Sequence, residues 1–192
     1  MNQPLKQTLQ DDAESFGTYP TPSSLHLERI LPGTVERVWA YLTEPGKRAK
    51  WFSAGIMPTK VGEGFELLFN NQTLGKSGPG NDTPERFKKY ENKTMNSMMT
   101  RYDPPHALGF TFGVGENSSE VLFELKPHAK GVLLIVKHWK LTTSEGKLNV
   151  SAGWHTHLGV LVDLLYENQP RPFWSRFESL EEEYQKRIPS LS

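Results

Sequence analysis

The chain of 192 residues is long enough for one domain of ordinary size, which can bury a core without a metal ion or a disulfide bond. Its 22 basic and 22 acidic residues leave no net charge, and we expect no nucleic-acid partner because such proteins carry a basic excess. The lack of cysteine excludes disulfide scaffolds, thiolate zinc sites, iron–sulfur clusters and cysteine nucleophiles.

The sequence predicts neither export nor membrane insertion. Residues 1–10 contain no basic segment followed by an apolar run, so we expect no secretory signal. The longest apolar run, residues 131–136, is far shorter than the roughly 20 residues that a membrane span needs. We therefore expect a cytoplasmic protein without a membrane span.

The first 23 residues predict a mobile N-terminal arm. They are rich in Gln, Asp, Pro and Ser and show no sustained periodicity, so they bury too little apolar surface to offset the cost of ordering. The folded domain is expected at residues 24–192, with an additional C-terminal helix in residues 170–192. Its first element is a strand over residues 24–31, where apolar and polar side chains alternate.

Two short helices are expected after this strand. Thr34 is a suitable N-cap, and the apolar residues behind it recur at helical spacing on one face: Val35, Val38, Trp39 and Leu42. The second helix starts around Pro45, where the missing N–H of proline is harmless, and ends near Trp51 and Phe52.

The middle of the chain predicts an antiparallel meander. Strands are expected at residues 65–69, 93–102, 108–112, 120–125 and 131–142. The segment 70–86 is dense in Asn, Gly and Pro, which is typical of a long surface loop. Because successive strands are joined by short turns and share an apolar side, they fit one sheet.

After Gly146 the apolar period changes to about 3.6 residues, which predicts the longest helix, ending before Pro170. One face of this helix carries an apolar stripe, and the opposite face carries Asn149, Thr156, Asp163 and Glu167; the stripe consists of Val150, Trp154, Leu158, Leu161 and Leu165. A last amphipathic helix over residues 173–187 is expected to pack on its own domain. The fold class is therefore α+β, a curved antiparallel sheet wrapped on a long C-terminal helix, with room between the two.

Three segments resemble a known family. Residues 27–45, followed by Ala49-Lys-Trp-Phe52, are similar to the opening of START-like (SRPBCC) domains, in the AHSA-type branch named after the activator of the ninety-kilodalton heat-shock protein's ATPase. Residues 60–67 and 152–161 resemble that branch's glycine-rich entry to the second strand and its terminal helix. The resemblance covers roughly residues 24–168 and implies a helix-grip fold with an apolar cavity under the terminal helix.

The resemblance implies several functions rather than one. Related domains bind lipids, hormones or polyketides, and a few catalyse cyclisation. The co-chaperone that gives the branch its name carries a further domain ahead of this one, where this chain has a short arm. A chaperone partner and a role in the stress response are therefore weaker expectations than ligand binding.

The candidate ligand-binding residues are aromatic and methionine side chains with a few polar groups, because ligand pockets are mostly apolar and methionine adapts to varied shapes. For each apolar candidate a plain core role is an equally good interpretation. Tyr102 and His157 are expected at the rim, where they would orient the ligand, and His138 is expected nearby. The apolar candidates are Trp51, Phe69, Met98, Met99, Phe110, Phe112, Trp154 and Leu161.

The histidines give little support for metal binding or catalysis. His155 and His157 are two residues apart on a helix and point away from each other, so they cannot hold one metal ion. His138 meets His157 if its strand face is concave, but a structural histidine is the favoured interpretation. Glu28, Arg29 and Arg101 are interpreted as residues of exposed strand faces.

The favoured function is the binding of a hydrophobic or amphipathic small molecule between sheet and long helix, without a metal, a cofactor or catalysis. One alternative is a protein-interaction module that acts on a chaperone or a toxin-like partner through the C-terminal helix. The other is a cyclase- or hydratase-type enzyme that uses His138 and His157 as acid and base. A homodimer is compatible with all three.

Overall fold

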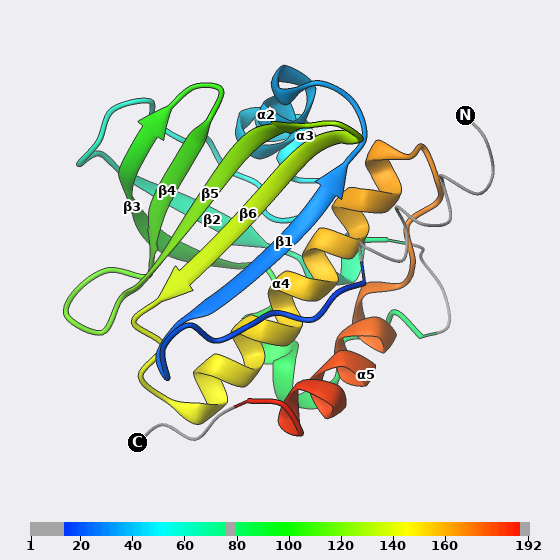
Figure 1. Ribbon diagram of the computed structural model, residues 1–192. Coiled ribbons are helices and arrows are strands. Elements are labelled where there is room, and N and C mark those ends of the chain that lie inside the picture. Colours follow the sequence, from blue (N-terminus) through cyan, green and yellow to red (C-terminus); the bar gives the residue numbers. More distant parts are fainter. Residues whose placement is uncertain (1–13, 76–79, 189–192) are drawn as a thin grey trace.

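The computed structural model describes residues 14–75 and 80–188, which form an α+β fold around a curved antiparallel sheet (Figure 1). The strands lie in the order β1-β6-β5-β4-β3-β2, so β1 closes one edge of the sheet beside β6. The strands in the described residues are β1 (Leu25–Leu31), β2 (Gly64–Phe69), β3 (Lys93–Asp103), β4 (Ala107–Phe112), β5 (Ser119–His128) and β6 (Gly131–Trp139).

Figure 1 shows α4 lying along the sheet beside β1, with α5 packed next to α4 and the two short helices at one end of the sheet. The predicted helix-grip arrangement is therefore confirmed. The α-helices in the described residues are α2 (Val35–Thr43), α3 (Pro45–Arg48), α4 (Ser144–Leu165) and α5 (Phe173–Gln185). None of these helices is both long enough and apolar enough to cross a membrane.

The loop expected at residues 70–86 contains more structure than its composition indicates. Two 3₁₀ helices, η1 (Asn71–Thr73) and η2 (Glu85–Tyr90), form in and just after it. Asn81 fixes this segment, because its Nδ2 donates to the carbonyl oxygens of Gln72 and Leu74 at 2.9 and 3.1 Å. The amide of Trp174 donates to Oδ1 of the same asparagine, which ties the segment to α5.

Helix α4 begins earlier than expected. Thr143 is its N-cap and accepts a hydrogen bond from the amide of Gly146, which places this poor helix former in the first turn rather than before the helix. Strand β6 accordingly ends at Trp139, and Lys140 adopts a φ of 64° as the chain turns toward the helix.

The core lies between the concave face of the sheet and the apolar stripe of α4. Phe110, Phe123 and Val136 share the concave face and are at most 2% exposed, as are Leu158 and Leu161 on α4. Each such side chain contributes about 1.5–3 kcal/mol by leaving water. Gly131 is needed at the start of β6, since with its φ of 135° an added Cβ would lie 2.2 Å from the carbonyl oxygen of Leu31.

The part of α4 opposite the apolar stripe that carries Thr156 and Asp163 is buried. Thr156 and Asp163 are 2% and 6% exposed, because α5 and the chain before β1 cover this face. Each has a polar partner: Thr156 donates to the carbonyl oxygen of Ala152, and Asp163 accepts a hydrogen bond from Nε of Arg171 at 3.1 Å.

The chain before β1 also differs from a free arm. Residues 1–13 lie outside the described residues, but Phe16 packs edge-on against the rings of His155 and Tyr184. The amide of Gly17 donates to the hydroxyl of Tyr184 at 2.9 Å, and Thr18 pairs with His26 of β1. Residues 14–18 therefore belong to the packed structure, a result of a few specific contacts that average composition does not show.

Candidate functional site: a cavity between the sheet and two helices

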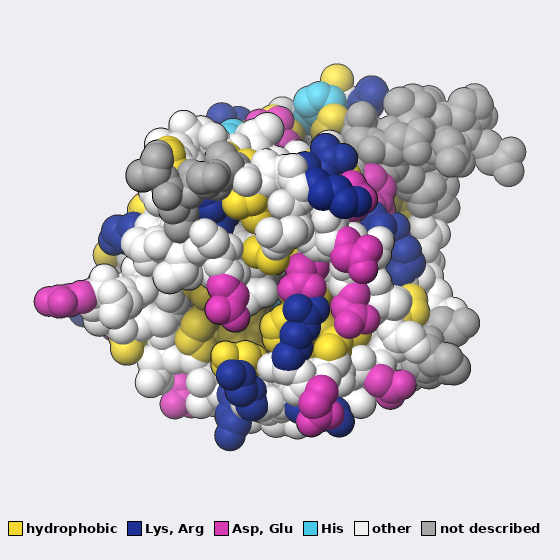
Figure 2. Space-filling model, turned by 90° about the horizontal axis from the view of Figure 1, so that it is seen from below, with side chains coloured by type: hydrophobic (Ala, Val, Ile, Leu, Met, Phe, Trp, Pro, Cys, Tyr) yellow, Lys and Arg dark blue, Asp and Glu magenta, His cyan; other side chains and the backbone are white. Residues whose placement is uncertain are grey.

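A cavity of about 460 Å³ lies between the sheet and the helices α4, α5 and η2. Ligand pockets in proteins usually measure about 300–1,000 Å³, so the space suits a small organic molecule. Figure 2 shows the hollow in this face of the molecule, with hydrophobic side chains in it and charged side chains of both signs around it.

The sheet and α4 form two walls of the cavity. Phe69 of β2, Met95 of β3 and Phe112 of β4 line it from the sheet, and Trp154 lines it from α4. Phe52, in the segment after α3, stacks on Trp154 with ring centroids 4.9 Å apart. These contacts give the cavity flat aromatic surfaces, which favour apolar and aromatic occupants.

Gly153 leaves part of the α4 wall open. It lines the cavity, and a Cβ added to it would meet no atom within 4 Å. A side chain at this helical position would therefore extend into open space rather than meet packed atoms.

Helix α5 and η2 form the remaining wall. Phe173, Trp174 and Phe177 line the cavity from α5 and are at most 5% exposed. Phe87 of η2 stacks on Trp174 at 5.3 Å and meets Phe177 edge-on at 5.2 Å. The aromatic face of α5 thus packs on its own domain, as the sequence analysis expected, and it encloses the cavity.

The polar lining residues gather where the cavity meets solvent. Lys93 and Thr94 are exposed, and Asn71 and Asn149 are half-buried. The fifth, Glu91, is half-buried and anchors the wall, because its Oε1 accepts hydrogen bonds from the hydroxyl of Thr83 and the indole of Trp174 at 2.8 and 3.2 Å.

His157 is the buried polar side chain of the described lining. It is 6% exposed, and its Nδ1 lies 2.7 Å from the carbonyl oxygen of Trp51. Burial lowers the pKa of His157 to about 4 despite the hydrogen bond to Trp51, so the imidazole is neutral at physiological pH.

His138 lies behind Trp154 and does not line the cavity. The indole N–H of Trp154 donates to His138 Nδ1 at 2.9 Å, so the neutral ring carries its proton on Nε2 and donates to Ser119 Oγ at 2.8 Å. Burial lowers the pKa of His138 to about 3. Both ring nitrogens are therefore occupied in a structural role, which the sequence analysis favoured.

The cavity brings together four of the eleven candidate ligand-binding residues: Phe69, Phe112, Trp154 and His157. His157 is buried inside the cavity rather than at its rim. The other apolar candidates that lie outside its lining and in the core are Trp51, Met99, Phe110 and Leu161, each at most 1% exposed.

Met98 and Tyr102 lie away from the cavity. Met98 follows Met95 by three positions on β3 and so points to the outer face of the sheet, where it is 42% exposed. Tyr102 packs edge-on against Trp39 of α2 at 5.6 Å, near the other end of the domain. Tyr102 was expected at the rim but does not line this cavity, because its position on β3 places it against α2.

The sequence analysis missed the residues that enclose the cavity from its third side. Phe87 lies in a segment without a clear pattern. Phe52, which stacks on Trp154 at another wall, was also missed because it follows a helix of four residues and gave no periodic signal. Phe173, Trp174 and Phe177 had a helical pattern, but that pattern does not indicate which surface the helix faces.

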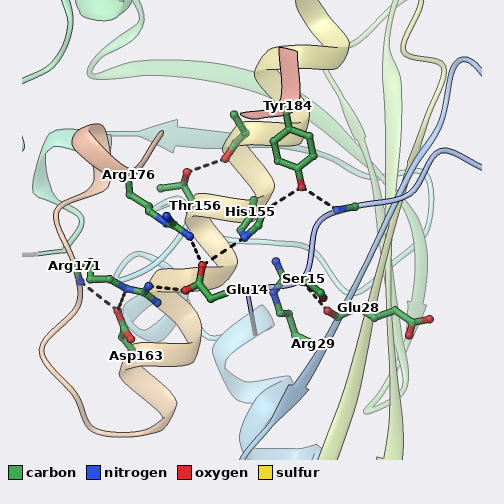
Figure 3. A network of polar contacts seen from close by, with 12 residues as sticks. Glu14, Ser15, Glu28, Arg29, His155, Thr156, Asp163, Arg171, Arg176 and Tyr184 are labelled. Carbon is green, nitrogen blue, oxygen red and sulfur yellow. Dashed lines mark hydrogen bonds and ion pairs between the residues drawn. The ribbon is translucent and has the colours of Figure 1, made fainter. Parts of the chain in front are cut away.

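A polar network lies on the other side of α4 (Figure 3). The Glu14 carboxylate is its centre and accepts hydrogen bonds from Arg171, at 2.5 Å, and from Arg176. His155 Nε2 approaches the same carboxylate at 3.8 Å. Burial opposes the ionisation of Glu14, but the contact with His155 and the charges of both arginines outweigh burial and lower the pKa of Glu14 to about 2.

Arg29 lies next to this network and is buried, contrary to the expectation from the sequence. Its side chain is 1% exposed, not part of an exposed strand face, because residues 14–18 cover the inner face of β1 at this point. The guanidinium Nη1 donates to Ser15 Oγ at 3.3 Å and to the Glu28 carbonyl oxygen at 2.7 Å. Glu28 and Arg101 are exposed, as expected.

The described residues hold no group of three or more His, Asp or Glu side chains that could bind a metal ion. The geometry of the cavity thus offers apolar burial, aromatic stacking and one buried imidazole, with polar groups at the opening.

Comparisons with known proteins agree with this architecture. The family described as Activator of Hsp90 ATPase homolog 1-like protein matches residues 32–166. The protein encoded by gene BPP1335 from Bordetella parapertussis is 37% identical, with a TM-score of 0.76 and 92% of each chain covered. No curated protein matches the chain.

Two more distant structures show the fold alone. CalU16 from Micromonospora echinospora is 18% identical with a TM-score of 0.63, covering 91% of this chain and 96% of its own. The conserved protein of unknown function EF2215 from Enterococcus faecalis is 17% identical with a TM-score of 0.67, covering 95% of each. Because the family match spans most of the chain, the protein belongs to the family of Activator of Hsp90 ATPase homolog 1-like proteins.

Proposed function

We propose that the protein binds one hydrophobic or amphipathic small molecule in the cavity between the sheet and the helices α4 and α5. The observation that carries this proposal is the aromatic space of about 460 Å³ that remains after the core is packed. Protein interiors are otherwise close-packed, and an open apolar space of this size leaves aromatic surface in contact with water unless a ligand covers it. The polar opening suits an amphipathic occupant.

The burial of apolar surface supplies enough free energy for useful affinity. A ligand that loses about 300 Å² of apolar surface gains about 7.5 kcal/mol at about 25 cal/mol per Å². Part of this gain offsets the lost freedom of the ligand, so we expect a dissociation constant between about 10 µM and about 1 mM.

The alternatives have less support. An enzyme that uses His138 and His157 as acid and base lacks a free nitrogen on His138, whose Nδ1 and Nε2 already bond Trp154 and Ser119. A partner that docks on the aromatic face of α5 would meet side chains that are buried, since Phe173, Trp174 and Phe177 are at most 5% exposed.

Gly153 offers a direct test of the proposal. N-phenyl-1-naphthylamine, a neutral dye that fluoresces in apolar surroundings, should bind the unliganded protein with a stoichiometry of one and receive excitation energy from Trp154 and Trp174. Gly153→Leu places a branched side chain in the space beside Trp154 and should weaken dye binding at least about tenfold, as expected when about 1.4 kcal/mol of binding is lost.

The matched control is Gly153→Ala. It makes the same helix position stiffer but adds a single methyl group, so dye affinity should change less than about threefold while the helix gains up to about 1 kcal/mol of stability. Equal dye affinity in Gly153→Leu and in the unmodified protein would contradict binding in this cavity. Native mass spectrometry of the purified protein would then show whether a co-purified molecule is bound at all and with what stoichiometry.

A further inference from the structure

The buried imidazole in the cavity has a defined proton position. His157 Nδ1 lies 2.7 Å from the carbonyl oxygen of Trp51, and a carbonyl oxygen can only accept, so Nδ1 carries the proton and donates. In a neutral imidazole the other nitrogen then holds a lone pair. Nε2 is therefore a hydrogen-bond acceptor.

This acceptor has no hydrogen-bond partner among the described residues, and it is not among the side-chain atoms that are closed off from solvent. His157 is 6% exposed and lines the cavity, so the accessible surface of its ring lies in the cavity. A ligand that fills the cavity excludes solvent from Nε2, which costs free energy unless the ligand supplies a hydrogen-bond donor in its place.

The surroundings of His157 indicate the shape of the group that carries the donor. The imidazole is flanked by Phe52, Trp154 and Phe173, with ring centroids 5.3, 6.1 and 4.8 Å away. A flat ring fits between such surfaces, and a donor attached to that ring can point along the imidazole plane toward Nε2.

We propose that the ligand is an uncharged aromatic molecule with a hydrogen-bond donor, a phenolic hydroxyl or a ring N–H, that His157 Nε2 accepts. This inference rests on the proposed function, because it assigns a chemical class to the same cavity. His157 is a specificity-determining residue in this account: it selects donors over ethers and hydrocarbons of equal shape.

The same geometry disfavours anionic groups at this depth. A carboxylate has lone pairs on both oxygens and would place them against the Nε2 lone pair in an apolar space. Burial lowers the pKa of His157 to about 4, so the ring does not become a cation at neutral pH to accommodate the anion. An anionic headgroup would be tolerated only at the opening, near Lys93.

The experiment compares three probes of similar shape at pH 7: 2-naphthol, 2-methoxynaphthalene and 2-naphthoate. The unmodified protein should bind 2-naphthol about tenfold more tightly than the methyl ether, the ratio expected for one buried hydrogen bond, and should bind 2-naphthoate most weakly. His157→Phe should reduce the ratio of 2-naphthol to ether to about one. His106→Phe, the same exchange at an exposed histidine outside the cavity lining, is the matched control and should keep the ratio.

A measurement on the unmodified protein covers the case in which His157→Phe does not fold. Nitrogen-15 chemical shifts of His157 report whether each ring nitrogen is protonated or accepts a hydrogen bond. The Nε2 resonance should have the position of an unprotonated nitrogen in the free protein and that of a hydrogen-bonded acceptor with 2-naphthol, whereas the ether should move it toward the position of a bare acceptor. A protonated Nε2 in the free protein would overturn the inference.

The outcomes separate this inference from the proposed function. Equal affinities for 2-naphthol and the ether, both weakened by Gly153→Leu, would overturn the role of His157 and leave the cavity as the binding site. Failure of all three probes and of the naphthylamine dye to bind would overturn both. A preference for 2-naphthol that survives in a folded His157→Phe variant would overturn the role of His157 alone.

Discussion

Three histidines in this domain are held neutral by their surroundings. Burial is the largest cause in each case and lowers the pKa values of His138 and His157 to about 3 and about 4. The pKa of His155 is also lowered by burial, although Glu14 acts in the opposite direction. Each imidazole thus has a fixed hydrogen-bonding role rather than an acid–base role at neutral pH.

These shifts predict how stability depends on pH. In the unfolded chain a histidine takes up a proton near pH 6.5, whereas folded His138 and His157 do not, so the free energy of unfolding falls as pH decreases through 6.5. Urea unfolding should show a loss of about 2–3 kcal/mol between pH 7.5 and pH 5.5, about 1.4 kcal/mol for each of these two residues.

The variant His138→Gln tests whether the buried histidines cause this pH dependence of stability. The variant should be less stable at pH 7.5, because Trp154 loses its acceptor or keeps it in a poorer geometry, but its stability should fall less between pH 7.5 and pH 5.5. If the free energy of unfolding changed equally with pH in the variant and in the unmodified protein, groups other than His138 would be its cause.

At the scale of elements, the Glu14 carboxylate connects the segment before β1 to α4, to α5 and to the loop between these two helices. Glu14 precedes β1, Arg171 lies between α4 and α5, and Arg176 lies on α5, while His155 contributes from α4. Because α5 carries Phe173 and Phe177 into the cavity, the network of Figure 3 also holds the cavity wall in place.

Glu14→Gln should loosen this connection. The substitution leaves two arginines beside a neutral amide, and we expect the free energy of unfolding to fall by about 1–2 kcal/mol at pH 7. This loss is smaller than that expected for a fully buried ion pair, because the Glu14 side chain is 32% exposed. In the unmodified protein this contribution should disappear as pH falls from about 4.5 toward the folded pKa of about 2. Hydrogen exchange at the Gly17 amide should become faster in the variant.

Glu28→Gln is the appropriate comparison. This carboxylate on β1 is 55% exposed and pairs with His26 at the surface, so its loss should change stability by less than about 0.5 kcal/mol. Equal stability of Glu14→Gln and Glu28→Gln at pH 7 would show that the network does not hold the chain before β1.

At the scale of the whole molecule, the fold could be predicted and the cavity could be predicted only in part. The strands show a two-residue alternation of apolar and polar side chains, and α4 shows an apolar repeat of about 3.6 residues. Both patterns are local in sequence, so the sheet and its long helix could be predicted. Trp154 and Phe112, two of the candidate residues, line the cavity because they lie on those two regular faces.

The remaining parts depend on long-range packing. Thr156 and Asp163 look like surface residues until α5 and residues 14–18 cover them, and Arg29 looks exposed until the same segment lies over β1. Phe87 reaches the cavity from a 3₁₀ helix that no periodic pattern marks. The depth of His157 follows from its contact with Trp51, 106 positions away in sequence.

The central claim is that the space beside Trp154 receives a ligand, and locating a bound molecule tests it most directly. In crystals grown or soaked with 6-bromo-2-naphthol, we predict an anomalous bromine peak inside the cavity, with the hydroxyl group within hydrogen-bond distance of His157 Nε2. A compound that binds in solution but gives its bromine peak outside the residues lining this cavity would contradict the account.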